Sequence, residues 1–542
     1  MHISKLHLAS QNKLLNDFLL GNEPISSFFG ANPLKREEME TRLKYVTNKS
    51  YNRNGLVSAI EGFHKKHDAS SESNENVRKL LKDDTFVVIG GQQAGLLTGP
   101  LYSIYKIISI IQLAKKYEND YGVAVVPVFW IAGEDHDIDE INHVNVIEND
   151  QVKKHTYYQK TPFPMSASKT EIDKNEMKKW LLKIFKTFEE TEYTNELITD
   201  LEKMISESNT YVDFFAKVLF KMFKKEGLVL IDADDPNVRR LESDLFEDMI
   251  NRQDIVRSVL KDTKRKLTNA GYQETLFISE QAIHLFYHSN EGRQLLEVTE
   301  NEDQFSTKNK RVNFTKEDLC KVAKYSPELL SNNVVTRPIM QEYLFPTLAF
   351  VGGPGEIAYW AELKEVFKVF DLEMPPVFLR HMFTVFERNI LSAMEDFSIT
   401  IEKSLENSIE ELKLKWLNEQ VKIDYKSMFS NALKSLEELH KPLQEITSNI
   451  TPNLKDFSKK NYQKLEDQVK LLESKIEETI FKQNEEQINK WNRIISSVSP
   501  NGKPQERVMN VFYFINKYGF DFVQELCELD LSWDFAHQII KI

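Results

Sequence analysis

Two segments of this chain place polar side chains directly after an apolar run. Gly90–Gly99 reads Gly-Gly-Gln-Gln-Ala-Gly-Leu-Leu-Thr-Gly and follows the run Thr85–Ile89. Glu134–His143 reads Glu-Asp-His-Asp-Ile-Asp-Glu-Ile-Asn-His and follows the run Val123–Ala132. Such apolar runs are typical of buried parallel strands, and open parallel sheets bind ligands beyond the carboxyl ends of their strands. Together the two segments predict one active-site mouth.

The glycine-rich segment favours an anion, because glycine lets backbone N–H groups approach a ligand and a following helix adds its positive end. A helix is predicted over Pro100–Lys116, with Thr98 as its cap and Pro100 in its first turn. The segment matches neither Walker A nor Gly-x-Gly-x-x-Gly. A tight turn around a buried glutamine pair is the structural alternative. The candidate binding residues are Gln92, Gln93, Gly95, Thr98, Gly99 and Lys106.

The acidic segment has the residue types for acid–base chemistry, for orienting an amine or for holding a metal. We take Asp135, His136 and Asp139 as the catalytic candidates. Asp135 would be the electrostatic anchor of a substrate amine, and His136 its proton acceptor. If the segment is helical, Asp135 and Asp139 share a face. A solvated helix start is the alternative, since acidic residues favour first turns. No metal ligand is assigned.

A third segment, Val351–Tyr359, repeats the order of strand, glycine loop and helix. Arg337 precedes Pro338 at the end of a predicted strand, Val334–Pro338, and is a candidate clamp for a carboxylate or phosphate. An ordinary structural ion pair is the alternative for Arg337. We expect Arg337 and the Gly352–Glu356 loop to help the first glycine segment bind its anion.

Composition limits the class of protein. The chain has 542 residues and 41% hydrophobic content, enough for a sizeable core and several domains. A net charge of −13 argues against a general nucleic-acid-binding protein. Cys320 and Cys527 form no CxxC pair, so the sequence supports neither a zinc site nor a disulfide scaffold. With no signal-peptide pattern and no run long enough to cross a bilayer, we expect a cytoplasmic protein without nucleic-acid or membrane partners.

The remaining α/β pattern ends near Arg380. The expected elements before that point are polar helices up to about residue 84 with a Ser/Asn-rich break at 70–76, a hairpin across Glu148–Asp150, helices over 171–226, a third strand within Gly227–Pro236, and a β insertion over 275–300.

From about residue 386 the composition shifts to Glu, Lys, Leu, Asn and Ile. Apolar residues recur every three or four positions, and Pro442 and Pro452 interrupt the run. Two long helices with a broken connection predict an antiparallel coiled-coil arm, with an ordinary helical bundle as the alternative. A stripe on this arm predicts a homodimer. The stripe consists of Leu465, Val469, Leu472 and Ile476.

The chain as a whole resembles the cysteine-adding enzymes of bacillithiol biosynthesis, a family of cysteine ligases. The resemblance is carried by Gly91–Lys106, by Phe129–Asp137, by Arg337-Pro338 with Gly352–Trp360, and by the helical C-terminal third. It implies an α/β fold with a Rossmann-type parallel sheet core and connecting-peptide insertions over residues 1–380, and an α-helical coiled-coil domain over 381–542. It also implies addition of cysteine to glucosaminyl-malate, which gives the low-molecular-weight thiol bacillithiol. The shared motifs complete the candidate binding residues with Trp130, Gly353, Glu356 and Tyr359.

Amide formation in water requires an activated carboxyl group, and ATP-dependent adenylation would provide it, so ATP is the expected cofactor. Thr98-Gly-Pro-Leu101 stands where class I nucleotidyltransferases have His-x-Gly-His, and Met165-Ser-Ala-Ser-Lys169 has only a chance likeness to Lys-Met-Ser-Lys-Ser. Two other classes stay open. One is a metal-assisted hydrolase or transferase built on the Asp/His cluster, and the other is a non-catalytic interaction protein that acts through the arm.

Overall fold

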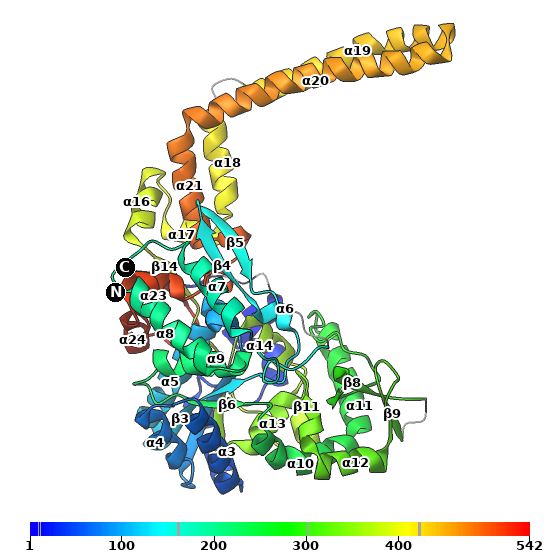
Figure 1. The fold of residues 1–542 in the computed structure, drawn as a ribbon. Coiled ribbons are helices and arrows are strands. Elements are labelled where there is room, and N and C mark those ends of the chain that lie inside the picture. Colours follow the sequence, from blue (N-terminus) through cyan, green and yellow to red (C-terminus); the bar gives the residue numbers. More distant parts are fainter. Residues whose placement is uncertain (9, 11, 160–162, 301–302, 421–423) are drawn as a thin grey trace. The chain divides into compact units, whose positions relative to one another are not determined.

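The chain forms two compact units in the computed structural model, which describes residues 1–8, 10, 12–159, 163–300, 303–420 and 424–542 (Figure 1). The first unit contains residues 1–148, 152–385 and 504–542, and the second contains 149–151 and 386–503. The predicted division at residue 380 did not include the return of the chain to the first unit at Pro504.

A parallel five-stranded sheet forms the centre of the first unit, with the strand order β13-β12-β2-β3-β6. The three strands predicted from apolar runs are confirmed as β2, β3 and β6, and they are neighbours. The bounds are β2 (Thr85–Gln92), β3 (Ala124–Ile131), β6 (Val229–Asp232), β12 (Thr347–Gly352) and β13 (Val377–Leu379).

Helices cover both faces of this sheet. Val88 lies in a core with α5, α7, α8 and α9, whereas Val87 lies in a second core with α1, α3, α10, α11, α13 and α14. Successive strand residues point to opposite faces, so both must be apolar. The helices are α1 (Lys13–Leu20), α2 (Arg36–Thr47), α3 (Arg53–Lys66), α4 (Ser71–Lys79), α5 (Leu101–Tyr121), α6 (Ile138–Ile141), α7 (Lys174–Phe185), α8 (Thr194–Glu207), α9 (Tyr211–Met222), α10 (Pro236–Asn251), α11 (Gln253–Asn269), α12 (Lys316–Tyr325), α13 (Thr336–Leu344), α14 (Pro354–Trp360), α15 (Lys364–Val369), α22 (Gln505–Val508), α23 (Phe512–Tyr518) and α24 (Asp521–Glu528).

The predicted β insertion is a second, antiparallel sheet with the order β10-β9-β8-β7-β11. It extends beyond the expected residue 300, because β11 lies in it. Its strands are β7 (Ala282–Ser289), β8 (Gly292–Val298), β9 (Gln304–Thr307), β10 (Asn313–Thr315) and β11 (Leu330–Asn332).

Two smaller sheets complete the strands. The predicted hairpin is confirmed, and its turn residues Asn149 and Asp150 both have positive φ, as two-residue hairpin turns require. The other small sheet joins the two chain ends, because the first strand pairs antiparallel with the last. These strands are β4 (His143–Glu148), β5 (Gln151–Thr156), β1 (His2–Leu6), β14 (Phe383–Phe386) and β15 (His537–Lys541).

Three local predictions are wrong, two because a short-range hydrogen bond was overlooked and one because a residue far along the chain takes the place of the cap. The expected break at 70–76 is the start of α4, since Ser70 Oγ accepts the Ser73 N–H at 3.1 Å. The expected strand Val334–Pro338 is instead the start of α13. There, Asn333 Oδ1 accepts the N–H groups of Val335 and Thr336 at 2.8 and 3.1 Å and turns the chain into a helix.

The third correction concerns Thr98, which does not cap α5. The residue before this helix is Pro100, and no side chain accepts a hydrogen bond from the helix's first N–H groups. Instead the backbone carbonyl of Met509 accepts the Leu101 N–H at 2.9 Å. Among the described residues, no helix is both long and apolar enough to cross a membrane.

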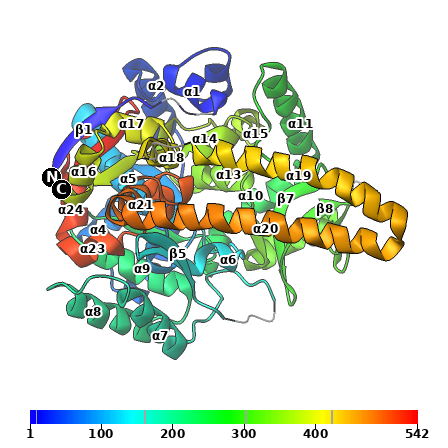
Figure 2. The ribbon, with the colours of Figure 1, turned by 90° about the horizontal axis from the view of Figure 1, so that it is seen from above.

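The second unit is helical, and its two longest helices, α19 and α20, lie side by side as an antiparallel pair (Figures 1 and 2). Pro442 lies inside α19, so the predicted interruption there is wrong, whereas Pro452 begins α20 as a break would require. The helices are α16 (Arg388–Asp396), α17 (Ile401–Glu406), α18 (Ile409–Gln420), α19 (Tyr425–Ile450), α20 (Pro452–Gln483) and α21 (Glu485–Val498).

Candidate functional site

The strand order reverses between β2 and β12. From β2 the chain proceeds to β3 and β6 on one side, and it later adds β12 and β13 on the other side. In open α/β sheets, ligands bind beyond the strand ends at such a reversal. The two glycine-rich segments and the acidic segment follow β2, β12 and β3, so the sheet brings all three to one edge, as predicted.

Lys106 connects the first two of these strand ends. Its buried ammonium group donates to Gly91 O at 2.7 Å and to Gln92 Oε1 at 3.0 Å, and it pairs with the Glu356 carboxylate. Glu356 also accepts the Gly353 N–H at 2.8 Å. Burial lowers the pKa of Lys106, and the Glu356 carboxylate opposes that change. Lys106 therefore fixes the relative position of the loops, and its donors are already engaged.

Glu134 lies at the end of β3, is fully buried and pairs with two arginines. Arg239 of α10 contacts one carboxylate oxygen, and Arg337 Nε contacts the other at 3.3 Å. Arg239 also donates to Glu242 Oε2 at 2.7 Å. The two terminal nitrogens of Arg337 donate to no side chain or carbonyl in the described part of the chain. Arg337 therefore keeps two free donors for an anionic ligand.

Asp135 lies beside this pair and is only partly exposed. Gln93 Nε2 donates to Asp135 Oδ2 at 2.8 Å and to Glu140 Oε2 at 2.8 Å. Burial alone would raise the pKa of Asp135, but Arg293, the Gln93 amide and Arg337 outweigh it, and the pKa lies below its ordinary value. Asp135 is therefore ionised at neutral pH, as an anchor for an ammonium group requires.

His136 faces Arg293, a residue of strand β8 in the insertion sheet. Arg293 Nη1 lies 3.2 Å from His136 Nδ1. The pKa of His136 is lowered, first by burial and then by the Arg293 charge. Arg293 was missed from the sequence because it lies in the predicted β insertion over 275–300, and no local signal places that insertion beside the end of β3.

The end of β6 adds a second acidic group to this edge. Ser168 Oγ donates to the Asp232 carboxylate at 2.7 Å, and Ser166 Oγ donates to Asp234 Oδ2 at 2.7 Å. Burial and the neighbouring Asp234 raise the pKa of Asp232 to about 7. A side chain at Gly133 would overlap Asp232 and Ser168, which explains the glycine there.

Both serines lie in the segment Met165–Lys169, which sequence analysis set aside as a chance likeness. Its backbone pairs with the β3 end, because the Ala167 N–H donates to Asp135 O at 2.8 Å and the Ser168 N–H to Gly133 O at 3.0 Å. The segment therefore belongs to the site. The carboxylate-rich end of the third strand was a usable signal for Asp232, but nothing in the sequence linked it to these serines.

The loop before α5 has a strained backbone. Leu97 and Thr98 have φ values of 47° and 71°, which non-glycine residues rarely adopt, and Gly99 follows with 69°. The Asn510 amide donates to Leu97 O at 2.8 Å and to Gly99 O at 2.7 Å. Strained backbone of this kind occurs at ligand sites and needs support from its surroundings. Here the support comes from the last part of the chain.

Two predicted residues lie away from this group. Trp130 is fully buried in the second core, where its ring packs edge-on against Phe345 at 6.5 Å. Asp139 is exposed on α6, where its carboxylate accepts from Asn142 at 3.2 Å. Asp135 precedes α6, so the two aspartates do not share a helix face. The other candidates, Gln92, Gln93, Gly95, Thr98, Gly99, Lys106, Asp135, His136, Arg337, Gly353, Glu356 and Tyr359, lie at the strand ends or in the elements that follow them.

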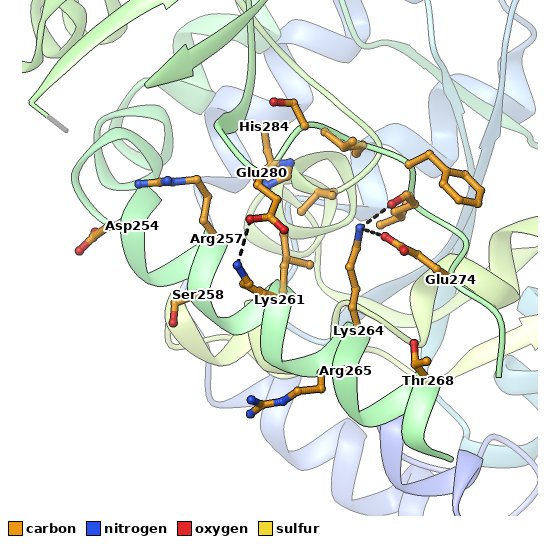
Figure 3. Close-up of a pocket in the computed structure, with 16 residues that line it drawn as sticks. Asp254, Arg257, Ser258, Lys261, Lys264, Arg265, Thr268, Glu274, Glu280 and His284 are labelled. Carbon is orange, nitrogen blue, oxygen red and sulfur yellow. Dashed lines mark hydrogen bonds and ion pairs between the residues drawn. The ribbon is translucent and has the colours of Figure 1, made fainter. Parts of the chain in front are cut away.

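In the described part of the chain, no three His, Cys, Asp or Glu side chains converge as metal ligands would. A separate cavity of about 860 Å³ lies between α11 and the loop leading into β7 (Figure 3). Lys261 and Lys264 line it and are paired with Glu280 and Glu274, respectively. None of the predicted site residues lines this cavity, so it is distinct from the strand-end site.

Comparison with known proteins agrees with this architecture. Residues 1–381 match the family model "Bacillithiol biosynthesis BshC, N-terminal Rossmann-like domain", and residues 383–542 match "Bacillithiol biosynthesis BshC, C-terminal coiled-coil domain". Proteins named "Putative cysteine ligase BshC" from Bacillus cytotoxicus, Geobacillus sp. and Bacillus cereus are 40%, 41% and 40% identical, each over 100% of both chains. The predicted resemblance and the predicted fold class are confirmed. The chain belongs to the BshC family of bacillithiol biosynthesis, and the members compared above carry the name cysteine ligase.

Proposed function

We propose that this protein joins cysteine to glucosaminyl-malate in the last step of bacillithiol biosynthesis, as a cytoplasmic amide-forming ligase. The single observation that carries the proposal is that an ionised Asp135 and the free terminal nitrogens of Arg337 lie at the same strand-end mouth. Glucosaminyl-malate has an amine and two carboxylates. An anionic anchor and a cationic clamp side by side match those groups.

The two charged residues bind different groups of the substrate. Asp135 attracts the glucosamine nitrogen and aims it into the mouth, while Arg337 binds a malate carboxylate through two parallel N–H groups. Glu134 holds Arg337 through its Nε and thereby leaves the terminal nitrogens directed to the ligand. With glucosaminyl-malate held at both ends beside a bound, activated cysteine, the attack becomes effectively unimolecular, which is a large part of what such a site contributes.

The chemical step forms a C–N bond between the amine and the cysteine carboxyl carbon. It breaks the bond from that carbon to its activating group, and the amine loses a proton. We propose that ATP activates the carboxyl group as an adenylate. The Thr98 hydroxyl and the loop Gly95–Gly99 would hold its phosphates. The loop suits phosphate because the Thr98 Oγ1 atom is buried without a partner among the described residues. Its hydroxyl can therefore donate a hydrogen bond to a phosphate oxygen.

The test combines purified protein, cysteine, glucosaminyl-malate and ATP, and searches for the cysteinyl product by mass spectrometry. Asp135→Asn should lower product formation about 100-fold or more, because it removes the negative anchor but keeps the Gln93 contact within reach. Asp262→Asn is the matched control, since Asp262 is exposed on α11 and pairs with Arg265 of the same helix. Absence of product from the unaltered protein, with and without ATP, would reject the proposed reaction.

A further inference from the structure

Arg293 is held rigidly at the end of β3 although it comes from the insertion sheet. Its Nε donates to Ser331 Oγ at 2.9 Å, and its Nη2 donates to Asn332 O at 2.6 Å. The guanidinium lies 3.7 Å from the centre of the Phe286 ring. The side chain is 4% exposed. Nε and Nη2 are bound to β11 and one face of the guanidinium packs on Phe286 of β7, so Nη1 is left to face His136, with Asp135 Oδ1 farther away at 3.8 Å.

This contact determines which nitrogen of His136 carries the proton. A guanidinium group only donates hydrogen bonds, so His136 Nδ1, 3.2 Å away, must accept one. A nitrogen that accepts carries no proton, so the proton of the neutral ring lies on Nε2. Nε2 donates to no side chain or carbonyl of the described residues, and the side chain is 32% exposed.

The charged groups around the His136 ring have opposite effects on its pKa. Arg293 from β8 opposes a positive charge on His136, whereas Asp135 and Asp137 of its own loop favour one. Asp135 Oδ1 lies 3.9 Å from Nδ1, too far for a hydrogen bond, and it is also drawn to Arg293 at 3.8 Å and to Arg337 of α13. Burial and Arg293 prevail, and the pKa of His136 lies below its ordinary value.

We infer that Arg293 is a positioning residue that keeps His136 as a neutral hydrogen-bond donor, with Nε2–H directed to an oxygen of the reacting carboxyl group. This inference rests on the proposed function for the identity of that oxygen. It replaces the expectation that His136 accepts the amine proton, because Nε2 already holds a proton and Nδ1 is occupied by Arg293. A neutral imidazole that polarises a carbonyl oxygen is an effective electrophile, and one such donor typically contributes about 10²–10³-fold in rate.

The first experiment needs no substrate. The protein is labelled with ¹⁵N in its histidine rings, and the His136 signals are identified by their loss in His136→Gln. We expect an unprotonated Nδ1 and a protonated Nε2 at neutral pH. A protonated Nδ1, or a doubly protonated ring at neutral pH, would overturn the inference whether or not the protein is a ligase.

Variants of Arg293 then show whether this residue determines the tautomer of His136. Arg293→Met should raise the pKa of His136, because one opposing charge is lost while Asp135 and Asp137 remain, and both tautomers should appear. Arg293→Lys, which keeps a cationic donor, should restore much of the unaltered pattern. Arg311→Met is the matched control, because Arg311 is exposed, belongs to the same insertion and pairs with Glu291 rather than with a site residue. An unchanged His136 titration in folded Arg293→Met contradicts the inference.

Activity measurements show whether His136 donates a hydrogen bond or takes up a proton. The amide of His136→Gln donates a hydrogen bond but takes up no proton, so it should retain much more activity than His136→Ala, which should lose about 100-fold. Equal loss in both variants would show that the imidazole takes a proton and would reject the donor role. If no variant and no unaltered protein forms product, the proposed function fails, whereas the tautomer measurement still decides the role of Arg293.

Discussion

Asp232 is a carboxylic acid whose surroundings change its proton affinity on folding. It ends β6, is buried, and has a pKa raised from 3.8 to about 7 by burial and by Asp234. Between these two pH values the unfolded chain has lost the proton, whereas the folded protein retains it. The folded state binds more protons, so this group makes the protein less stable as pH rises from about 4 to about 7.

Asp232→Asn should therefore stabilise the protein above pH 7, by a free energy of unfolding on the order of 2 kcal/mol, and have little effect at pH 4. The asparagine oxygen still accepts the Ser168 hydroxyl, so the packing is retained. Thermal denaturation of both proteins across this pH range is the measurement. A melting-temperature difference that does not grow with pH would show that Asp232 does not titrate as proposed.

Arg239 is the cation on which several buried acids depend. It is fully buried, pairs with Glu134 and Glu242, and lies 3.6 Å from Asp234. Arg239→Met leaves these carboxylates without their cation, and we expect it to cost about 3–5 kcal/mol in the free energy of unfolding. Arg240→Met, at the exposed neighbouring position, is the control and should change it by less than about 0.5 kcal/mol. Chemical denaturation compares the two, and equal midpoints would contradict the buried network.

Whole elements were predictable from sequence where one segment supplied the signal. The runs at Thr85 and Val123 predicted adjacent buried strands, and the polar groups after them predicted the mouth. The contacts that complete the site join segments far apart in the chain. Arg293 reaches His136 across 157 positions, and Asn510 reaches Leu97 across 413. Periodicity and spacing report local structure only, so neither partner was predictable without the fold.

The loop before α5 depends on one such distant residue. Asn510→Ala removes the two hydrogen bonds to the carbonyls of Leu97 and Gly99 and a third from the Phe512 N–H. At about 1 kcal/mol each, their loss should lower the free energy of unfolding by roughly 3 kcal/mol. Asn510→Asp should cost more, because a buried carboxylate oxygen would replace the donating amide nitrogen and face the two carbonyl oxygens. We expect faster hydrogen exchange around Gly95–Leu101 in both variants, together with lower melting temperatures. If Asp is tolerated better than Ala, the amide donors do not hold the loop.

At the scale of the whole molecule, the helical arm formed by α19 and α20 exposes apolar side chains. The predicted stripe is divided in the structure, since Val469 and Ile476 are half-buried whereas Leu465 and Leu472 are exposed. A more continuous exposed stripe runs along α19. Its members are Leu439, Leu443, Ile446 and Ile450, which are 73%, 55%, 58% and 62% exposed. Contiguous apolar surface of this kind marks an interaction site.

We propose that a second copy of the chain covers this stripe, because helices with apolar residues at such spacing pair with one another and two-fold dimers are the commonest oligomers. Leu443→Glu with Ile446→Glu should then give a folded monomer by light scattering, with unchanged helical content by circular dichroism. Ser430→Glu with Ser448→Glu adds the same charge to exposed positions on the face of α19 opposite the stripe, and it should leave the dimer intact. A double variant that stays dimeric would exclude this stripe as the contact, and one that unfolds would assign it to packing within a single chain.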